Sequence, residues 1–317
     1  MALIGSDILQ AKQLLENGSL VAIPTETVYG LAANALLETA VLSIFETKQR
    51  PAFDPLIVHV ANIGQVNRYA DWQHPALKKL AEAFWPGPLT ILLPKKDLVP
   101  DLVSSGLPQV AIRVPNHPLT IELLQQLPFP LAAPSANPFG YISPTTAAHV
   151  NRQLGQKIPY ILDGGPCGIG LESTIVGMEA NEIVVYRLGG LSLDAIEKIV
   201  GKVQVKQNLS SNPLAPGQLK SHYAPSKQLI IGDIGENLNK HKGKKIAVLS
   251  FAESFNATNI VLHLNLSPQG NLEEAALNLF KMLRLADESN ADIILTTLLP
   301  KKGLGLAIND RLIRAAN

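Results

Sequence analysis

A chain of 317 residues is longer than one hydrophobic core usually supports, so the sequence favours two domains. Hydrophobic residues make up 46% of the chain and charged residues 17%, which is typical of an aliphatic globular protein and excludes intrinsic disorder. With 27 Lys and Arg against 26 Asp and Glu, the net charge is too small for a bulk affinity for nucleic acid or anionic membranes, so we expect stable binding to neither.

The single cysteine, Cys167, excludes an intramolecular disulfide and any multi-cysteine zinc site, which fits a reducing cytoplasm. We expect it to be a small buried hydrophobic residue. The first seven residues lack the basic segment of a signal peptide, and no apolar run reaches membrane-spanning length. The sequence therefore predicts a cytoplasmic protein.

The first 200 residues alternate short apolar strands with helices, separated by Pro and Gly. Apolar residues recur at helical spacing over 41–48 and 77–84. Strands are expected at 20–23, 56–60, 89–93, 110–114, 131–133, 160–162, 175–176 and 183–188. This alternation predicts an α/β fold with a mainly parallel or mixed sheet.

Residues 204–228 are polar and rich in turn formers, and we interpret them as a linker. A functional role is favoured because His222 and Tyr223 lie near its far end. A second α/β pattern follows over 229–317, with strands at 229–231, 246–250, 260–264 and 293–295 and a long amphipathic helix at 272–287. The predicted organisation is thus a domain at 1–203, a linker or lid at 204–228 and a smaller domain at 229–317.

Cationic or titratable side chains interrupt three otherwise apolar strands. Arg113 lies opposite its apolar strand neighbours, and Arg187 and His59 do the same in theirs. Burying a guanidinium costs several kcal/mol, to an order of magnitude, unless an anion meets it. The partner of each could be a protein carboxylate or a ligand phosphate, and the two are about equally favoured.

Two polar segments follow the strand at 131–133. Ser135 and Asn137 come directly after it, where open α/β sheets bind ligands, although a simple Asx or Ser turn is favoured about two to one. Further on, Ser143 and Pro144 resemble an N-cap followed by the first residue of a helix. Such a helix start would also offer amide donors to a phosphate.

Common catalytic motifs are missing from the sequence. It has neither a Walker A motif nor a GxGxxG turn between a strand and a helix, and it lacks a GxSxG elbow. The seven histidines do not fall at metal-ligand spacings. What remains is a set of cations, hydroxyls and amides, including Lys48 and Arg50 at the end of a helix, which suits positioning and charge stabilisation rather than covalent catalysis.

Ordered motifs spanning roughly residues 8 to 200 closely resemble the YrdC-type threonylcarbamoyl-AMP synthases. They are Pro24-Thr25-Glu26-Thr27-Val28-Tyr29-Gly30-Leu31, Lys48-x-Arg50-Pro51, Pro55-Leu56-Ile57-Val58-His59, Trp85-Pro86-Gly87-Pro88-Leu89-Thr90, Arg113-Val114-Pro115, Pro134-Ser135-Ala136-Asn137 and Glu172-Ser173-Thr174-Ile175-Val176. Later motifs resemble the long, two-domain form of that family: Ala215-Pro216-Gly217, His222-Tyr223-Ala224-Pro225, Gly303-Leu304-Gly305 and Ala307-Ile308-Asn309-Asp310-Arg311.

This resemblance implies a YrdC-like catalytic domain at 1–203, with a twisted, mostly mixed sheet, flanking helices and a concave basic site, followed by a smaller Rossmann-like α/β domain. It implies synthesis of L-threonylcarbamoyl-AMP from L-threonine, bicarbonate and ATP with release of pyrophosphate. The product would pass to a tRNA threonylcarbamoyl transferase complex. Mg²⁺ would enter with ATP, bound through its phosphates and without a protein cage.

The resemblance also assigns residues to the site. Lys48 and Arg50 would neutralise the triphosphate and act in catalysis. ATP would be bound by Lys48, Arg50, Asp54, Gln109, Ser135, Asn137, Ser143, Arg187 and Tyr223. L-Threonine would be bound by Thr27, His59, Arg113, the backbone at Ala133, and Ser173. Asp54 stands where the family often has Asn, and Gln109 where Thr is frequent.

Two other functions remain open. One is a binding module for tRNA or double-stranded RNA, against which the near-neutral charge argues. The other is carbamoyl transfer to an acceptor other than threonine. The general base of the reaction is left unassigned.

Overall fold

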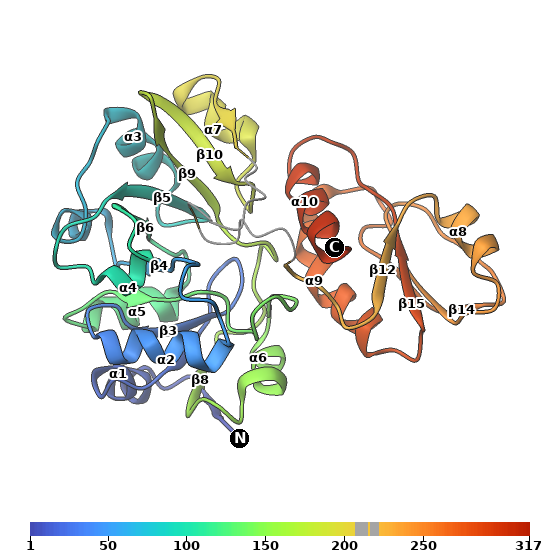
Figure 1. Ribbon diagram of the computed structural model, residues 1–317, viewed down its shortest axis with the longest axis horizontal. Coiled ribbons are helices and arrows are strands. Elements are labelled where there is room, and N and C mark those ends of the chain that lie inside the picture. Colours follow the sequence, from blue (N-terminus) through green and yellow to red (C-terminus); the bar gives the residue numbers. More distant parts are fainter. Residues whose placement is uncertain (207–214, 216–221) are drawn as a thin grey trace.

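The computed structural model of the chain describes residues 1–206, 215 and 222–317. Most of the expected linker, and with it the Pro216-Gly217 motif, lies outside the described residues. The N-terminal domain carries one large sheet and the C-terminal domain a smaller one (Figure 1). The large sheet extends to residue 205, slightly past the expected boundary at 203, and the boundaries themselves stay predictions.

The described residues of the N-terminal domain form an 11-stranded mixed sheet in the order β1-β8-β2-β3-β7-β4-β6-β5-β9-β10-β11. Its strands are β1 (Leu3–Gly5), β2 (Val21–Ile23), β3 (Gly30–Asn34), β4 (Ile57–His59), β5 (Leu89–Pro94), β6 (Gln109–Arg113), β7 (Leu131–Ala132), β8 (Tyr160–Leu162), β9 (Thr174–Glu179), β10 (Glu182–Arg187) and β11 (Gln204–Val205). The sheet contains parallel pairs such as β4–β6 and antiparallel pairs such as β5–β6, which confirms the predicted mixed α/β fold.

Helices flank this sheet (Figure 1). They are α1 (Ile8–Glu16), α2 (Glu38–Lys48), the 3₁₀ helix η1 (Ile63–Arg68), α3 (Pro75–Phe84), α4 (Asp101–Ser104), α5 (Pro118–Gln126), α6 (Ala147–Leu154) and α7 (Leu193–Val200). The helical spacings expected over 41–48 and 77–84 fall in α2 and α3.

The start of α6 differs from the expectation. The helix begins at Ala147 and is capped by Thr146, whose hydroxyl accepts from the His149 amide at 3.2 Å. Ser143 is therefore not the N-cap. Its hydroxyl instead donates to Glu172 at 2.5 Å, and residues 143–146 precede the helix.

The C-terminal domain contains a four-stranded parallel sheet in the order β12-β15-β13-β14, as predicted for an α/β unit. Its elements are β12 (Gln228–Ile231), α8 (Ile234–Lys240), β13 (Ile246–Ser250), β14 (Ile260–Asn265), α9 (Leu272–Glu288), β15 (Ile293–Thr296) and α10 (Gly305–Ala315). Helices α9 and α10 lie between this sheet and the N-terminal domain (Figure 1). Within the described residues, no helix combines the length and apolar character needed to cross a membrane.

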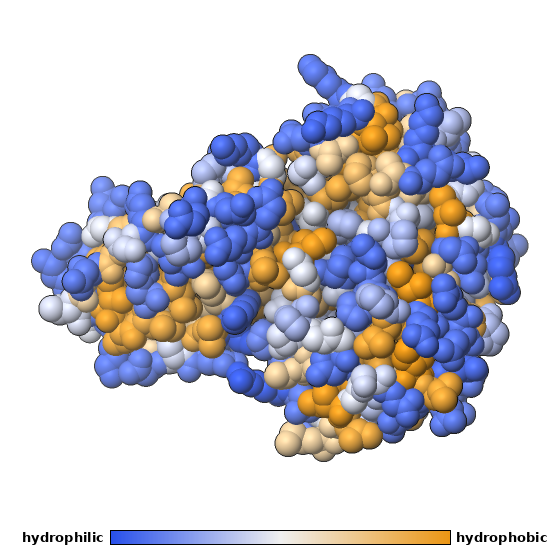
Figure 2. Space-filling view, turned by 180° about the vertical axis from the view of Figure 1, so that it is seen from behind, coloured by the Kyte–Doolittle hydropathy of each residue, from blue (hydrophilic) through white to orange (hydrophobic). Residues whose placement is uncertain are grey.

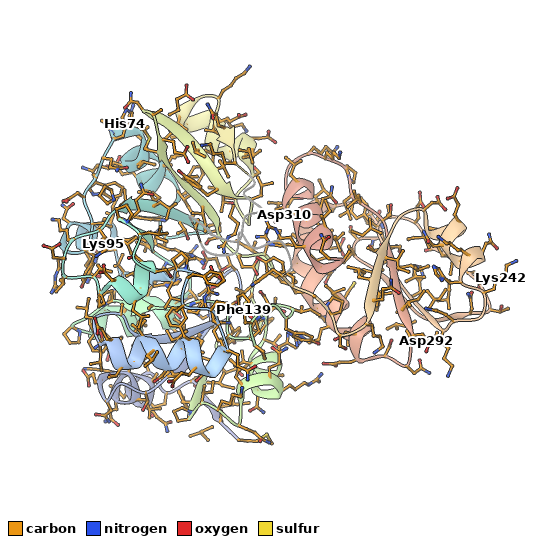
Figure 3. All side chains as sticks on the ribbon, viewed as in Figure 1. His74, Lys95, Phe139, Lys242, Asp292 and Asp310 are labelled. Carbon is orange, nitrogen blue, oxygen red and sulfur yellow. The ribbon has the colours of Figure 1, made fainter. Side chains whose placement is uncertain are left out.

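Hydrophilic and hydrophobic side chains are interspersed over the face seen in Figure 2, and a narrow waist separates the smaller domain from the larger one. Figure 3 places Lys242 and Asp292 on the far side of the smaller domain, whereas Asp310 lies at the boundary between the two. The middle of α10, which carries Asp310, is therefore near the N-terminal domain.

Every expected strand is present, with ends shifted by at most a few residues, but β1, β3 and β11 were not predicted from the sequence. Strand β3 has the sequence GLAAN, whose small residues lack the branched and aromatic side chains typical of strands. It forms because the neighbouring strands β2 and β7 pair with it on both sides. Strands β1 and β11 are too short to produce an apolar pattern.

Strand β6 occupies the centre of the large sheet and shows the predicted alternation. Val110 and Ile112 are buried in the main hydrophobic core, while Ala111 contributes to a separate apolar cluster on the other face. Arg113 follows at the end of the strand and is also buried. The strand thus carries a guanidinium into the molecule on a backbone held by β4 and β5.

Replacing Ile112 by Ala should lower the free energy of unfolding of the N-terminal domain by about 2 to 5 kcal/mol, because the fully buried side chain would leave a cavity. Both tryptophans, Trp72 and Trp85, lie in this domain, so their fluorescence in a urea titration reports its unfolding. The matched control is Ile199→Ala on the exposed face of α7, where the side chain is 42% exposed and we expect a change below about 0.5 kcal/mol. Equal effects of the two substitutions would contradict the assigned core.

Candidate functional site

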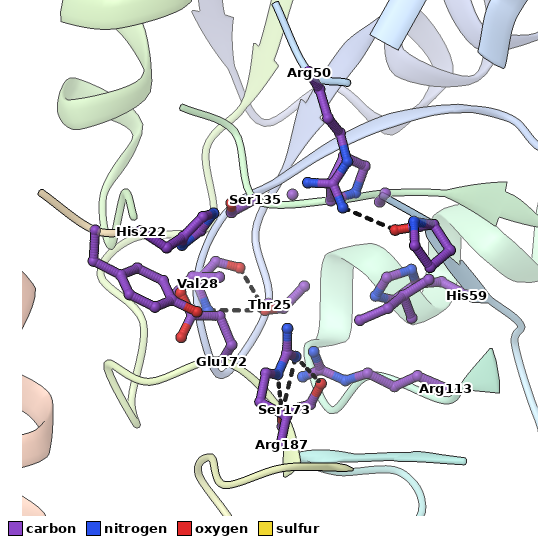
Figure 4. A pocket seen from close by; sticks show the side chains of 16 residues that line it. Thr25, Val28, Arg50, His59, Arg113, Ser135, Glu172, Ser173, Arg187 and His222 are labelled. Atoms are coloured by element: carbon purple, nitrogen blue, oxygen red, sulfur yellow. Dashed lines mark hydrogen bonds between the residues drawn. The ribbon is translucent and has the colours of Figure 1, made fainter. Parts of the chain in front are cut away.

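One cavity of the N-terminal domain gathers side chains from segments far apart in the sequence (Figure 4). Its described lining consists of Thr25, Val28, Gly30, Arg50, Pro55, Ile57, His59, Arg113, Ala133, Pro134, Ser135, Glu172, Ser173, Arg187, His222 and Tyr223. Eight of the residues assigned from the sequence are among them: Arg50, His59, Arg113, Ala133, Ser135, Ser173, Arg187 and Tyr223.

Two of these side chains come from the ends of adjacent parallel strands. His59 ends β4 and Arg113 ends β6, and the two residues are register partners in the sheet. Both are almost fully buried, with 3% and 4% of their surface exposed. Burial, followed by the nearby charge of Arg113, lowers the pKa of His59 to about 3, so the imidazole is neutral at physiological pH.

Arg113 has a carboxylate partner within the protein. Its guanidinium contacts Glu26 Oε1 at 2.6 Å and donates to the Thr27 hydroxyl at 3.0 Å and to the Gly87 carbonyl at 3.2 Å. Thr27 is itself buried and hydrogen-bonded to Thr25, so it lies behind the wall of the cavity and supports Arg113. The sequence left open whether a protein carboxylate or a ligand anion meets Arg113. In the structure, Glu26 supplies a protein carboxylate.

Arg50 is compensated in the same way. Its guanidinium pairs with Asp54 at 2.9 Å and donates to the carbonyls of Asp54 and Pro55 at 3.0 and 2.8 Å. Burial lowers its pKa, and the Asp54 charge opposes that shift. Asp54, which is fully buried and does not line the cavity, therefore holds Arg50 with the guanidinium at the cavity wall.

Arg187, at the end of β10, lies near Arg113 in the cavity (Figure 4). It donates to the Ser173 carbonyl at 2.9 and 3.0 Å and to the Ser173 hydroxyl at 3.0 Å. That hydroxyl also bonds Thr90 at 2.7 Å. Burial lowers the pKa of Arg187 to about 10, which leaves the side chain charged at neutral pH.

Lys48 has a different position from that expected. Its ammonium donates to the backbone carbonyls of Ser135 and Asn137, both at 2.5 Å, and it is not part of the described cavity lining. Burial, and then the charge of Arg50, hold its pKa well below the ordinary value. Lys48 thus stabilises the turn after β7, which carries Ser135 at the cavity wall.

The turn after β7 combines the two alternatives left open by the sequence. Asn137 donates its amide to the carbonyls of Pro138 and Tyr141 at 2.8 Å each, as a turn residue would. Its Oδ1 is buried without a hydrogen-bond partner in the described part of the chain. Ser135 lines the cavity, so the segment is a turn and also a cavity edge.

Besides Thr27, Lys48, Asp54 and Asn137, two further assigned residues lie outside the described lining. Gln109 begins β6 whereas Arg113 ends it, and a separation of four residues corresponds to about 13 Å along a strand. Ser143 is buried and donates to Glu172. The structure thus brings Ser143 to the back of the cavity and does not bring Gln109 to it.

Sequence reasoning assigned no role to three acidic or basic residues that matter here. Glu26 pairs with Arg113, Glu172 lines the cavity, and Arg311 of the C-terminal domain contacts Glu172 at 2.9 Å. Each stands within a motif that was recognised, but a charged residue in a motif does not reveal which distant residue it meets.

The described residues give little support to a metal ion held by protein ligands or to a cysteine nucleophile. No group of three or more His, Cys, Asp and Glu side chains is arranged to hold a metal ion within the described ranges 1–206, 215 and 222–317. Cys167 is buried, and burial raises the pKa of its thiol to about 12, so it is not a thiolate nucleophile. The cavity offers buried cations, hydroxyls and backbone groups, which stabilise anions.

The fold and this cavity define an α/β protein with a buried cationic cavity suited to an anionic ligand. Residues 13–189 match the family described as telomere recombination, which groups the Sua5, YciO and YrdC proteins, and residues 191–317 match the threonylcarbamoyl-AMP synthase C-terminal domain. The chain belongs to the threonylcarbamoyl-AMP synthase family, in its long two-domain form, and is an enzyme of that activity.

Two curated relatives match this chain over nearly its whole length. The threonylcarbamoyl-AMP synthase of Pyrococcus abyssi is 42% identical, with 96% of this chain and 93% of the relative covered. That of Bacillus subtilis is 40% identical, with 98% and 92% covered. A crystal structure of P. abyssi Sua5 complexed with L-threonine superposes with a TM-score of 0.93 at 40% identity, covering 99% of this chain and 98% of that one.

The neutral, buried His59 makes stability depend on pH. Between pH 6.5 and about 3, this residue is protonated in the unfolded chain but not in the folded one, so protonation favours unfolding and stability falls as the pH is lowered. From pH 7 to pH 5 its share is about 2 kcal/mol. His59→Gln should therefore flatten the pH dependence of urea unfolding, followed by tryptophan fluorescence, by that amount.

The matched control is His241→Gln, at the end of α8 in the other domain, which should leave the slope of the tryptophan transition unchanged. An identical slope for wild type and His59→Gln would show that His59 is not held neutral.

Proposed function

We propose that this synthase consumes ATP, L-threonine and bicarbonate and releases pyrophosphate with L-threonylcarbamoyl-AMP. The observation that carries the proposal is the convergence of Arg50, Arg113 and Arg187 on one cavity. Bicarbonate, a triphosphate and the threonine carboxylate are all anions, and buried guanidinium groups bind carboxylates and phosphates as rigid forks. The P. abyssi structure complexed with L-threonine supports the amino-acid part of the proposal.

Threonine would occupy the part of the cavity near Arg113. There the guanidinium would meet the threonine carboxylate, while the neutral His59 and the Ser173 hydroxyl offer hydrogen-bonding groups. Thr27 would act from behind by holding Arg113. The Ala133 backbone would complete this part of the wall.

ATP would occupy the part bounded by Arg50, Ser135, Arg187 and Tyr223. Arg50 lies on the opposite side of the cavity from Arg113 (Figure 4), so the phosphates and the amino acid would be bound on different sides of one cavity. Lys48 and Asn137 would act by shaping the turn that carries Ser135. Asp54 would hold Arg50, and Ser143 would hold Glu172.

The chemistry proposed for this arrangement needs no protein nucleophile. The threonine amine adds to carbon dioxide derived from bicarbonate and loses a proton, which gives a carbamate. A carbamate oxygen then attacks the α-phosphorus of ATP, and the bond to the bridging oxygen of pyrophosphate breaks. Negative charge builds on phosphoryl oxygens, where Arg50 and Arg187 would stabilise it.

Mg²⁺ would enter as the complex with ATP. The one carboxylate in the described lining, Glu172, already accepts from Ser143 and pairs with Arg311, so these residues do not form a metal cage. The ion would be bound through phosphate oxygens.

The product would be used in the cytoplasm. Threonylcarbamoyl-AMP is a mixed anhydride, which reacts readily with nucleophiles and would be passed to a tRNA threonylcarbamoyl transferase complex for the modification of tRNA. The near-neutral net charge agrees with an enzyme that does not itself hold tRNA firmly.

Pyrophosphate release measured with ATP, bicarbonate and each amino acid in turn tests the proposal. Release that requires both threonine and bicarbonate is the expected result. Release without threonine would contradict the proposal, and equal use of unrelated amino acids would favour carbamoyl transfer to another acceptor. Salt-dependent binding of RNA without turnover of ATP would favour a binding module.

Arg50→Ala should reduce kcat for pyrophosphate release by about 10²- to 10³-fold, as expected for the loss of one preorganised group that stabilises transition-state charge. The substitution also leaves Asp54 buried without its partner, so Arg50→Lys, which keeps the charge, should recover part of the rate. The matched control is Arg68→Ala, at an exposed position of η1. Wild-type turnover in Arg50→Ala would remove Arg50 from the site.

Serine lacks only the methyl group of threonine, so kcat/KM for serine should be roughly 10- to 200-fold lower. The measurement is pyrophosphate release over a series of serine and threonine concentrations. Equal kcat/KM values would show that no pocket is fitted to the methyl group.

A further inference from the structure

Arg311 of α10 is the largest fully buried side chain of the described residues, with 1% of its surface exposed, and it comes from the C-terminal domain. Its guanidinium pairs with Glu172 at 2.9 Å and with its neighbour Asp310 at 2.7 Å. It also donates to the Leu188 carbonyl at 2.8 Å and lies over the Tyr223 ring at 5.1 Å. One side chain of the C-terminal domain thus reaches three separate segments around the cavity.

Each of these segments borders the cavity directly. Glu172 and Tyr223 line it, and Leu188 follows Arg187, which also lines it. Arg311 is not itself in the described lining. It therefore contacts the residues that form the wall from behind.

Tyr223 depends on the C-terminal domain for its position. Its backbone has a φ of 67°, a left-handed conformation that is unfavourable for a residue with a side chain. Its ring stacks on Phe280 of α9, with centroids 5.5 Å apart and an interplanar angle of 28°. Phe280 and Arg311 together hold the ring against the cavity.

Glu172 poses an electrostatic problem for a cavity that binds anions. Glu172 is 6% exposed and lies in the cavity wall, where an uncompensated negative charge would repel the phosphates of ATP. It lies close enough to Arg187 to affect the pKa of that residue, so it could also compete with a ligand for the guanidinium. Arg311 supplies the compensating positive charge from outside the cavity.

We infer that Arg311 is a positioning residue of the synthase, through which the C-terminal domain neutralises Glu172 and holds Tyr223 so that the cavity accepts ATP. The inference rests on the proposed use of ATP. It assigns the C-terminal domain a part in the active site of the N-terminal domain.

Replacing Arg311 by Gln tests the inference. The neutral amide leaves Glu172 charged in the wall, so kcat/KM for ATP in threonine-dependent pyrophosphate release should fall on the order of tenfold or more, mainly through a higher KM. The double variant Arg311→Gln with Glu172→Gln removes the uncompensated charge as well. It should recover most of that loss, because the two residues act as a pair.

Recovery in the double variant separates charge compensation from general structural support. A purely structural role predicts that the two single substitutions add, or that the double variant is worse than either. Additive losses, or a wild-type KM for ATP in Arg311→Gln, would overturn the inference.

The matched control is Arg152→Gln. Arg152 also makes an ion pair between the two domains, with Glu288 at 2.5 Å, but this pair is exposed. We expect wild-type kinetics in this variant, since exposed pairs contribute little. A loss in Arg152→Gln equal to that in Arg311→Gln would overturn the inference in favour of general docking of the domains.

Arg311→Lys provides the test if Arg311→Gln does not fold, as judged by tryptophan fluorescence and thermal unfolding. Lysine keeps the charge beside Glu172 but cannot also match the other contacts of the guanidinium, so an intermediate rise in the KM for ATP is expected. A folded Arg311→Lys with a KM for ATP raised tenfold or more, as expected for loss of the charge itself, would contradict the inference. Failure of the proposed function is distinguishable, because wild type would then release no pyrophosphate in response to threonine.

Discussion

Charge compensation of buried cations determines how the cavity is built. Lys48, Arg50, Arg113, Arg187 and Arg311 are all at least 90% buried, and none of them could remain charged there without acceptors. Carboxylates, backbone carbonyls and hydroxyls provide these acceptors. A cavity with preorganised cations can stabilise phosphoryl charge without reorganising during the reaction, which agrees with the absence of a thiolate nucleophile among the described residues.

Buried charged side chains of α9 also connect the two domains. Asp287 of α9 accepts from Tyr141 at 2.6 Å and from Ser226 at 2.7 Å, and Arg284 donates to the Ile142 carbonyl at 2.9 Å. The contacts with Tyr141 and Ile142 reach the segment that leads from the turn after β7 to α6. Together with Arg311, they make α9 and α10 part of the support of the cavity, whereas the four-stranded sheet lies farther away (Figure 1).

Local patterns were sufficient to predict most strands and the position of Arg113. Apolar runs identify strands, and a charged residue in such a run must be buried near an acceptor. The identity of the acceptor could not be predicted, because Glu26 is 87 residues from Arg113 in sequence and Glu172 is 139 from Arg311. Likewise, the family resemblance placed Lys48 at the triphosphate, but it could not show that the Lys48 ammonium donates to the turn after β7.

The most direct test of the account is a crystal structure of the chain with ATP and L-threonine bound. The account predicts phosphate oxygens within hydrogen-bond distance of Arg50 and Arg187, and the threonine carboxylate at Arg113. Glu172 should remain paired with Arg311 and directed away from the phosphates. Ligands bound outside the cavity, or phosphates without contact to any of these guanidinium groups, would contradict it.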